Sequence, residues 1–189
     1  MELKKYWDKA ISFEEYMKVA DQRLNAPKDA QEEEFKEYYE LGLHRMERTL
    51  KTYKKDESQT ALLQSKNFSG KILIITEPWC GDASATVPAV SKFFEGENEV
   101  KIFLRDDDTS LIDQFLTNGT QSIPIVILLD ENYNVINHWG PRPEYGTELL
   151  KKFKADPEAY PKDDFYNDLQ VYYAKNRGKD AIQEILELI

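Results

Sequence analysis

The chain contains 189 residues, of which 41% are hydrophobic and 32% charged, so it has enough apolar side chains to bury a core and is not a disordered chain. Its net charge of −10 repels phosphate backbones, and no stretch gathers basic residues, which argues against nucleic-acid binding. No apolar run reaches the roughly 18–20 residues that cross a bilayer, and residues 1–18 lack the apolar centre of a signal peptide. We therefore expect a cytoplasmic protein that binds neither nucleic acid nor membrane.

Residues able to bind metal or form disulfides are scarce. The single cysteine, Cys80, has no partner within the chain, so neither a disulfide framework nor a two-cysteine redox cycle is expected. Only His44 and His138 are available to join it at a zinc site, and their spacing matches no ligand pattern. The sequence therefore predicts no metal and no organic cofactor.

The first 67 residues are predicted to be entirely helical. Ser12 and Glu15 have the spacing of a capping box, and apolar residues recur at helical intervals after them. A second helix is predicted over residues 29–55 and a short third one over residues 58–65. No strand is expected in this part of the chain.

From Gly70 onward the hydrophobic pattern becomes that of an α/β domain. Short apolar runs rich in β-branched residues predict strands, and amphipathic stretches between them predict helices. The predicted strands are 71–76, 100–105, 125–129 and 135–139. The predicted helices are 82–95, one that follows the capping residues 106–109, and 144–154. The first strands, which are joined by helical crossovers, should be parallel, and the last pair, joined by a tight turn, should be antiparallel.

This order of elements predicts a mixed four-stranded sheet with helices on both faces, in an α/β domain over residues 70–155. Two further helices are predicted, 163–176 and 179–189, after a linker with two prolines. The terminal extensions, 1–67 and 156–189, carry amphipathic stripes that have to be buried. We expect both extensions to pack on the sheet domain and form one body with it.

The surroundings of Cys80 indicate a reactive thiol. Cys80 lies in the turn Pro78-Trp79-Cys80-Gly81, between a buried strand and the N-terminus of a helix. Unpaired amide N–H groups at that end of a helix favour an anion and so lower a thiol pKa. Asp82 follows two residues later, and its negative charge opposes ionisation of the thiol. The sequence leaves open which of the two effects is larger.

The segment Trp79-Cys80-Gly81-Asp82 resembles the Trp-Cys-Gly-Pro-Cys active site of thioredoxins, in a Trp-Cys-Gly-Asp variant. Three further features match at the spacing of that family: Pro88, Ile123-Pro124 and Gly140. The resemblance covers residues 70–154 and implies a thioredoxin-like fold with Cys80 as the nucleophile. It also implies that Pro124 is the cis-proline beside the sulfur and that Gly140 belongs to a substrate-contacting loop.

Two departures from the dithiol pattern both argue against a two-cysteine mechanism. The resolving cysteine of a dithiol thioredoxin would stand at position 83, where this chain has Ala83, and Ser84 cannot replace it because a hydroxyl does not undergo thiol–disulfide exchange. The buried acid found six residues before the first cysteine in such enzymes is replaced by Ile74. The second thiol and the group that handles its proton are therefore both absent.

The remaining candidate residues are placed beside the thiol by the same resemblance. Trp79 is expected to shield the sulfur and form a contact surface, with plain packing as the alternative. Arg142 is expected on the loop after Gly140, where it would stabilise a thiolate, bind a carboxylate of a small thiol such as glutathione or bacillithiol, or have only a structural role. The predicted substrate-binding residues are Trp79, Gly81, Asp82, Ile123, Pro124, Gly140 and Arg142.

Three functions remain open at this point. The first is a monothiol thiol-disulfide oxidoreductase, in which Cys80 reacts with protein disulfides or a low-molecular-weight thiol adduct and an external thiol releases it. The second is a non-catalytic module whose groove between Trp79, Pro124 and Gly140 holds an extended peptide. The third is a structural relic without thiol chemistry. The sequence gives no indication of an oligomeric state.

Overall fold

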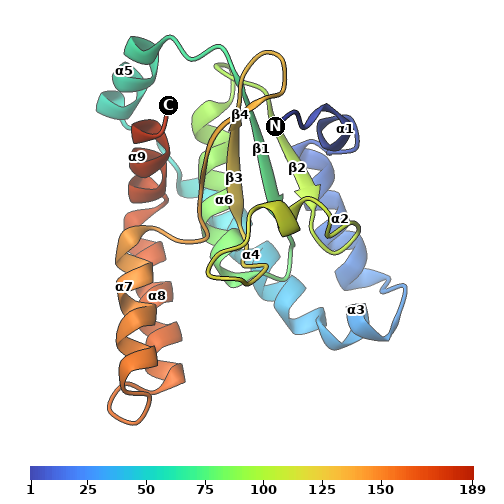
Figure 1. The fold of residues 1–189 in the computed structure, drawn as a ribbon. Helices are drawn as coiled ribbons and strands as arrows, with labels where there is room; N and C mark the ends of the chain where they lie inside the picture. Colours follow the sequence, from blue (N-terminus) through green and yellow to red (C-terminus); the bar gives the residue numbers. More distant parts are fainter.

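The computed structural model describes residues 1–189 and is built around one four-stranded sheet with the strand order β2-β1-β3-β4 (Figure 1). The strands are β1 (Lys71–Thr76), β2 (Val100–Leu104), β3 (Ile125–Leu129) and β4 (Val135–Trp139). Each lies within one residue of its predicted range, because continuous apolar runs bounded by turn residues mark buried strands clearly. The prediction of a mixed four-stranded sheet in an α/β fold is confirmed.

Nine α-helices accompany the sheet. They are α1 (Lys4–Trp7), α2 (Phe13–Asn25), α3 (Ala30–Glu34), α4 (Lys36–Thr52), α5 (Glu57–Lys66), α6 (Gly81–Phe94), α7 (Glu144–Ala155), α8 (Lys162–Asn176) and α9 (Lys179–Glu187). No helix combines the length and the apolar character that crossing a bilayer demands. The predicted capping box is present at α2, where the Ser12 hydroxyl accepts the Glu15 amide and the Glu15 carboxylate accepts the Ser12 amide.

The direction of the third strand differs from the prediction. β1 and β2 are parallel as expected, and β3 and β4 are antiparallel as expected. β3, however, runs antiparallel to β1, with Ile75 opposite Ile125. The prediction that it would be parallel was wrong, because it assumed a helical crossover between β2 and β3.

That crossover helix does not form. Between β2 and β3 the chain contains only one short 3₁₀ turn, η1 (Ile112–Gln114), while Leu111 and Ile112 are fully buried. Since β2 ends and β3 begins at the same edge of the sheet, this segment needs no long helix to return the chain. Asp108 caps a local turn by accepting the Ser110 amide, rather than starting a helix.

The N-terminal extension is also less regular than predicted. Glu2 and Ile11 form antiparallel bridges with Asn134 and Ile102, so residues 1–67 are not entirely helical. The Ile11 bridge occupies the outer edge of β2, which would otherwise present unpaired backbone groups. The single helix predicted over 29–55 is divided at Phe35 into α3 and α4.

Both faces of the sheet are covered. On β4, Trp139 donates from its Nε1 to Glu184 of α9, while the adjacent His138 packs its ring against Phe115 in the segment after β2. Neighbouring residues of a strand point to opposite faces. Helix α9 and the segment around Phe115 therefore cover opposite faces of the sheet.

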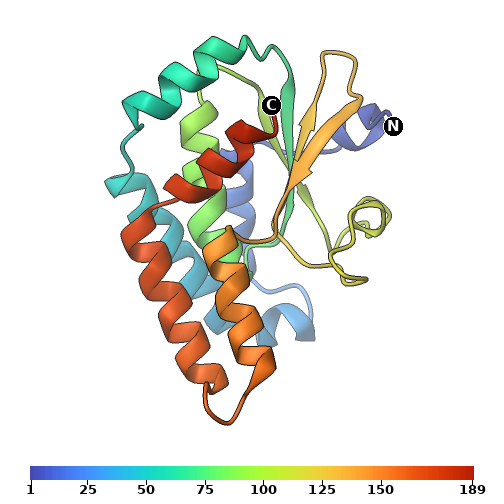
Figure 2. The ribbon, with the colours of Figure 1, turned by 60° about the vertical axis from the view of Figure 1, so that its left-hand side comes forward.

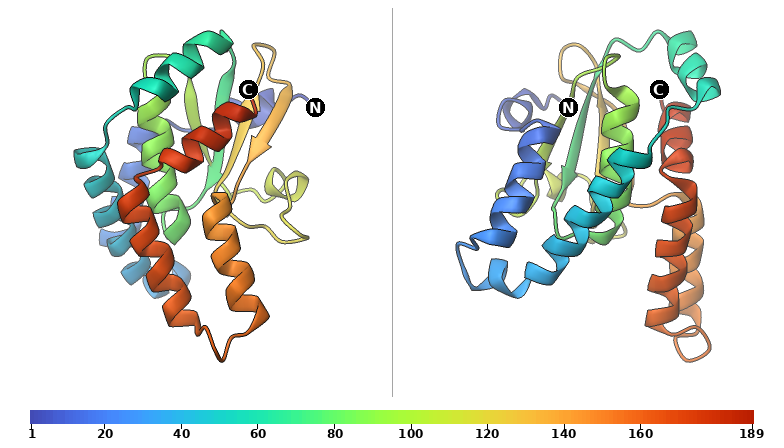
Figure 3. Two further views of the ribbon diagram at one scale, coloured as in Figure 1. Left: turned by 90° about the vertical axis from the view of Figure 1, so that its left-hand side faces the viewer. Right: turned by 180° about the vertical axis from the view of Figure 1, so that it is seen from behind.

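The terminal helices contribute to the same core as the strands. Tyr16 of α2, Met46 of α4 and Ile182 of α9 are fully buried in one hydrophobic cluster with β1 and β3. Helices α7 and α8 form an antiparallel hairpin that extends past the end of the sheet (Figure 2), with a small cluster of its own around Phe165 and Leu169. Figure 3 shows α4 and α8 on two sides of the end of α6 at which Cys80 lies.

Candidate functional site

The topology brings three segments to one edge of the sheet. The turn after β1 leads to Cys80, which is the N-cap residue of α6. Because β3 is antiparallel to β1, the residues just before it, including Ile123, lie beside the end of β1. β4 pairs Trp139 with Val126, so the loop with Arg142 emerges at that edge as well.

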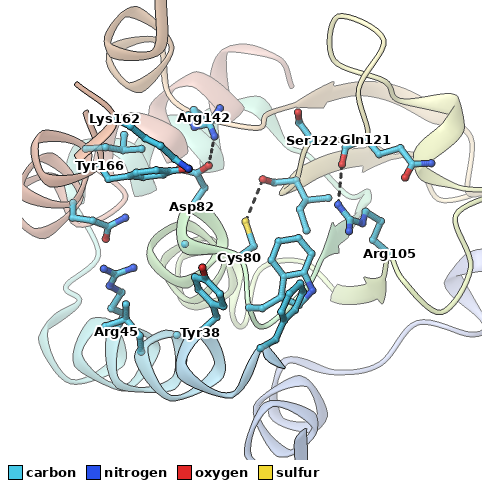
Figure 4. Close-up of a pocket in the computed structure, with 18 of the residues that line it drawn as sticks. Tyr38, Arg45, Cys80, Asp82, Arg105, Gln121, Ser122, Arg142, Lys162 and Tyr166 are labelled. Carbon is cyan, nitrogen blue, oxygen red and sulfur yellow. Dashed lines mark hydrogen bonds and ion pairs between the residues drawn. The ribbon is translucent and has the colours of Figure 1, made fainter. Parts of the chain in front are cut away.

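A cleft of about 890 Å³ opens at this edge (Figure 4). Its walls come from α4, from the turn and start of α6, from the loop 120–123 and from α8. The lining residues are Phe35, Tyr38, Leu41, Gly42, Arg45, Trp79, Cys80, Gly81, Asp82, Arg105, Thr120, Gln121, Ser122, Ile123, Arg142, Lys162, Asp163, Tyr166, Leu169 and Gln170. Both helical extensions therefore help to form the cleft.

The thiol of Cys80 lies at the base of this cleft and is held in its neutral form. The residue is 8% exposed, and Sγ donates a hydrogen bond to the carbonyl oxygen of Ile123 at 3.4 Å. Burial, followed by the negative charge of Asp82, raises the pKa of the Cys80 thiol to about 12. The amides of Ala83 and Asp82 and the charge of Arg142 act in the opposite direction and are outweighed.

Asp82 is the centre of a buried polar group between α6, α8 and the loop after β4. Its Oδ2 lies 2.7 Å from Nη2 of Arg142, and its Oδ1 accepts the Tyr173 hydroxyl at 2.8 Å. Burial raises the pKa of the Asp82 carboxyl, against the opposing effects of Arg142 and Tyr173. The Arg142 guanidinium is thus engaged inside the protein through Nη2, while its buried Nε has no partner.

Trp79 forms a wall of the cleft and is fixed by its neighbours. Its Nε1 donates to Asp106 at 3.0 Å, its ring meets Phe35 edge-on at 5.5 Å, and the Arg105 guanidinium lies 4.9 Å from the ring centre. The ring is half-buried. The indole therefore combines a packing role with a surface that borders the thiol.

Of the predicted site residues that follow β2, some line the cleft and others do not. Ile123 lines it, whereas Pro124 and Gly140 lie behind Ile123 and do not. The Ile123–Pro124 peptide bond is cis. Gly140 has φ +132°, and a Cβ there would collide with the Pro124 carbonyl oxygen, so only glycine fits. Of the seven predicted binding residues, the structure brings Trp79, Gly81, Asp82, Ile123 and Arg142 together at the cleft.

A second buried acid stands beneath the turn. Glu77 is fully buried, and its Oε2 lies 2.6 Å from Nη1 of Arg23 on α2. Its Oε1 accepts the Asp106 amide at 2.7 Å. Burial raises the pKa of the Glu77 carboxyl, opposed by the Asp106 amide and by Arg23. Although Ile74 is apolar, the site is therefore not free of buried acids.

Sequence reasoning missed the contributions of the two extensions. Arg45 of α4 and Tyr166 and Gln170 of α8 line the cleft, and Arg23 and Tyr173 hold its buried acids. No local motif marks these residues, since each is far from Cys80 in sequence. Only Glu77, three residues before Cys80, gave a signal: a charged residue directly after a strand of buried type.

The side chains at the site do not form a metal-binding group. No group of three or more His, Cys, Asp or Glu side chains is placed to hold a metal ion. The polar groups of the cleft include cationic, amide and hydroxyl groups from Arg45, Gln121, Ser122 and Gln170, and two carboxylates, Asp82, which is paired with Arg142, and the exposed Asp163. This set can bind anionic or peptide-like ligands.

A sheet of order β2-β1-β3-β4, with a cysteine capping the helix after β1 and an X-Pro bond before β3, defines a thioredoxin-like protein. The chain belongs to the thioredoxin family: a family model described as thioredoxin matches residues 29–154, about two-thirds of its length. The matched region begins well before residue 70, where the resemblance seen in the sequence starts, and it includes α4.

Comparison with solved structures shows the same fold. The chain resembles the crystal structure of an HIV epitope scaffold, with a TM-score of 0.66, 18% identity and coverage of 100% of this chain and 97% of that one. It also resembles a protein of unknown function from Pseudomonas aeruginosa, with a TM-score of 0.63, 17% identity and coverage of 100% and 96%. No functionally curated protein matches the sequence.

Proposed function

We propose that this chain is a thioredoxin-fold binding protein whose cleft holds an extended peptide. One observation carries the proposal: the loop 121–123 borders the cleft, and its backbone N–H groups donate to no backbone carbonyl of the chain. An extended peptide can accept these bonds as an added strand would, and place its side chains in neighbouring pockets.

The walls of the cleft suit such a ligand. Tyr38 and Tyr166 stand on opposite rims and are 58% and 49% exposed, so part of each ring is open to a ligand. Trp79 lines the cleft between them and the loop 121–123. Aromatic side chains bury large areas at little cost in conformational entropy and are enriched at binding surfaces.

A second candidate is monothiol exchange through Cys80. It is favoured by the amides of Asp82 and Ala83, both of which act to lower the thiol pKa. The thiolate would attack one sulfur of a disulfide R–S–S–R′, form Cys80–S–S–R and expel R′–S⁻. An external thiolate would then attack the sulfur of R and release the Cys80 thiolate. A single free thiol suits the reducing cytoplasm, where we place the protein.

The pKa of the thiol ranks the two candidates. A thiol with a pKa of about 12 carries very little thiolate near neutral pH, and the thiolate is the reactive form. Peptide binding needs no ionised thiol. The binding function therefore stands first.

Amide hydrogen exchange tests the first candidate. The protein is incubated with pooled peptides of random sequence, and exchange is followed by NMR at residues 121–123 and, as a control, at the turn 130–134, which lies outside the cleft. We expect slower exchange at 121–123 and no change at 130–134. Peptide binding that leaves 121–123 unprotected would refute the strand-addition mode.

Alkylation tests the second candidate. The rate of Cys80 modification by iodoacetamide is measured against pH in the native protein. A midpoint far above the ordinary thiol value of about 8.5 agrees with peptide binding as the leading function. A midpoint below that value, together with mixed disulfides captured from cell extract, would make monothiol exchange the better proposal.

A further inference from the structure

The cleft contains one half-buried cation that the protein leaves unpaired. Arg45 of α4 is half-buried and points into the cleft (Figure 4). Its guanidinium takes part in none of the fifteen ion pairs of the chain, and none of its five N–H donors finds a side-chain or backbone acceptor. The chain has 35 acidic residues, so the missing partner is not explained by composition.

The other cations of the cleft are engaged or lie in solvent. Arg142 pairs with Asp82 at 2.7 Å, and Arg105 pairs with Asp106 at 2.6 Å. Lys162 is exposed at the outer rim. Arg45 is therefore the partly desolvated cation that is free to meet a ligand.

The surroundings of Arg45 favour an anion. Burial, together with the charge of nearby Arg48, lowers the pKa of the Arg45 guanidinium. An unpaired charge taken out of water is unfavourable, and a carboxylate that accepts two of its N–H groups removes that penalty. The remaining wall of the small hollow behind Arg45 adds Arg48 and Arg177 and no acidic side chain.

The position of this cation relates it to the thiol. A Cβ built on Gly81 would lie 3.6 Å from Nη1 of Arg45 and 3.7 Å from Nε2 of Gln170. Both side chains thus reach over the residue that follows Cys80. A carboxylate bound by them would lie at the N-terminus of α6, whose amides also favour negative charge.

We propose that the cleft selects peptides that carry a free carboxylate, and that Arg45 binds this carboxylate next to Gly81. The inference rests on the proposed binding function and adds the chemical class of the ligand. The carboxylate can come from an Asp or Glu side chain or from a peptide C-terminus, since both present the same group.

Peptide arrays test this selection. Random-sequence peptides are attached through their N-termini and prepared in three forms. The first contains glutamate and has an amidated C-terminus. The second has glutamine in place of each glutamate and is also amidated, and the third contains glutamine and has a free C-terminal carboxylate. We expect at least one carboxylate form to be retained about tenfold more strongly than the amidated glutamine form. Which form is preferred identifies the source of the carboxylate.

Matched variants assign the effect to Arg45. Arg45→Met keeps the apolar stem and should abolish the preference, and Arg45→Lys should keep part of it. Lys51→Met, which removes an exposed cation of α4 outside the cleft, should leave it intact. In the unaltered protein the preference should also shrink as salt is raised, because the carboxylate partner is an ion.

The outcomes separate the two proposals. Equal retention of all three peptide forms would overturn the selection for a carboxylate and leave the binding function standing. A preference that survives in Arg45→Met, or that does not respond to salt, would overturn the role of Arg45. Retention of no peptide at all would overturn the binding function itself.

Discussion

At the scale of single residues, the site is governed by the balance of charges around one thiol. Cys80 has the helix N-terminus that usually activates a cysteine, yet burial and Asp82 outweigh it. Asp82 is itself held in place by Arg142 and Tyr173. The sequence showed that the helix N-terminus lowers the thiol pKa and that Asp82 raises it. Burial in the folded chain adds to the effect of Asp82 and makes the rise in pKa the larger effect.

Replacement of Asp82 by asparagine should lower the pKa of Cys80. Asp82→Asn removes the negative charge that ranks second after burial in raising this pKa, and leaves Arg142 unopposed. Each unit of decrease gives about tenfold more thiolate at a fixed pH below the midpoint. The alkylation rate of Cys80 against pH provides the measurement, with Arg142→Gln as the opposite control, because loss of that cation should raise the midpoint. An unchanged midpoint in Asp82→Asn would contradict the argument.

A cysteine at position 83 should pair with Cys80. Ala83 is fully buried, and the Ser84 amide donates to the Cys80 carbonyl at 3.0 Å, so Cys80 already takes part in the hydrogen bonding of α6. Residues three apart on a helix lie on one face, within the Cα separation of about 4.4–6.8 Å that a disulfide accepts. Ala83→Cys should therefore form an intramolecular disulfide under mild oxidation and gain weak insulin-reducing activity. Two free thiols after oxidation would show that the prediction is wrong.

At the scale of elements, helices outside the sheet domain hold the turn in place. Arg23 of α2 reaches Glu77 below the turn, and Tyr173 of α8 reaches Asp82 above it. A Cβ on Gly42 would lie 2.6 Å from the Pro78 carbonyl oxygen, so α4 also packs directly against the turn. The extensions are thus parts of the site, and the family match includes α4 but neither α2 nor α8.

Loss of the α2 contact should destabilise the protein. Arg23→Met leaves Glu77 as a buried carboxylate without its cation, and breaking a buried pair in this way costs about 3–5 kcal/mol in the free energy of unfolding. Urea denaturation at neutral pH gives the value. Lys18→Met, which removes an exposed ion pair from the same helix, should change the unfolding midpoint little. Equal stability of the two variants would mean that the buried pair contributes nothing.

At the scale of the whole molecule, several weak acids are buried in their neutral forms. Burial raises the pKa of Tyr53 and Tyr160 to about 12, and it is the first cause of the rise of the Cys80 pKa to about 12. It also raises the pKa of Tyr16 and Tyr173 above the ordinary tyrosine value. All five shifts have the same sign. They link folding to proton binding at alkaline pH.

Stability should therefore fall as the solution becomes alkaline. The unfolded chain loses these protons near the ordinary values, about 8.5 for cysteine and 10 for tyrosine, while the folded protein retains them. The stabilisation is complete below the unfolded values and is lost as pH rises from about 9 toward 12. Urea midpoints measured across this range should decline, and Tyr16→Phe should weaken the decline whereas Tyr145→Phe, at an exposed position, should not. A flat profile up to pH 11 would refute the linkage.

Local patterns determined much of this protein. The strand positions, the capping box at Ser12, the helix that follows Cys80 and the cluster of Trp79, Cys80 and Asp82 follow from residue spacing alone, because neighbours in sequence are neighbours in these elements. The family resemblance then placed Ile123 and Arg142 beside the thiol, where the structure has them.

Tertiary structure decided the rest. The direction of β3 depends on which edge of the sheet the chain returns to, and the run 106–116 was too short and too irregular for periodicity to show that it would not form a crossover helix. The pKa of Cys80 depends on its burial in the folded chain. That Arg45 has no acidic partner also follows only from the positions of the acidic side chains in the folded chain. Sequence determines which groups are present and their local geometry, whereas burial and charge pairing between distant elements exist only in the folded chain, and these control the chemistry of the cleft.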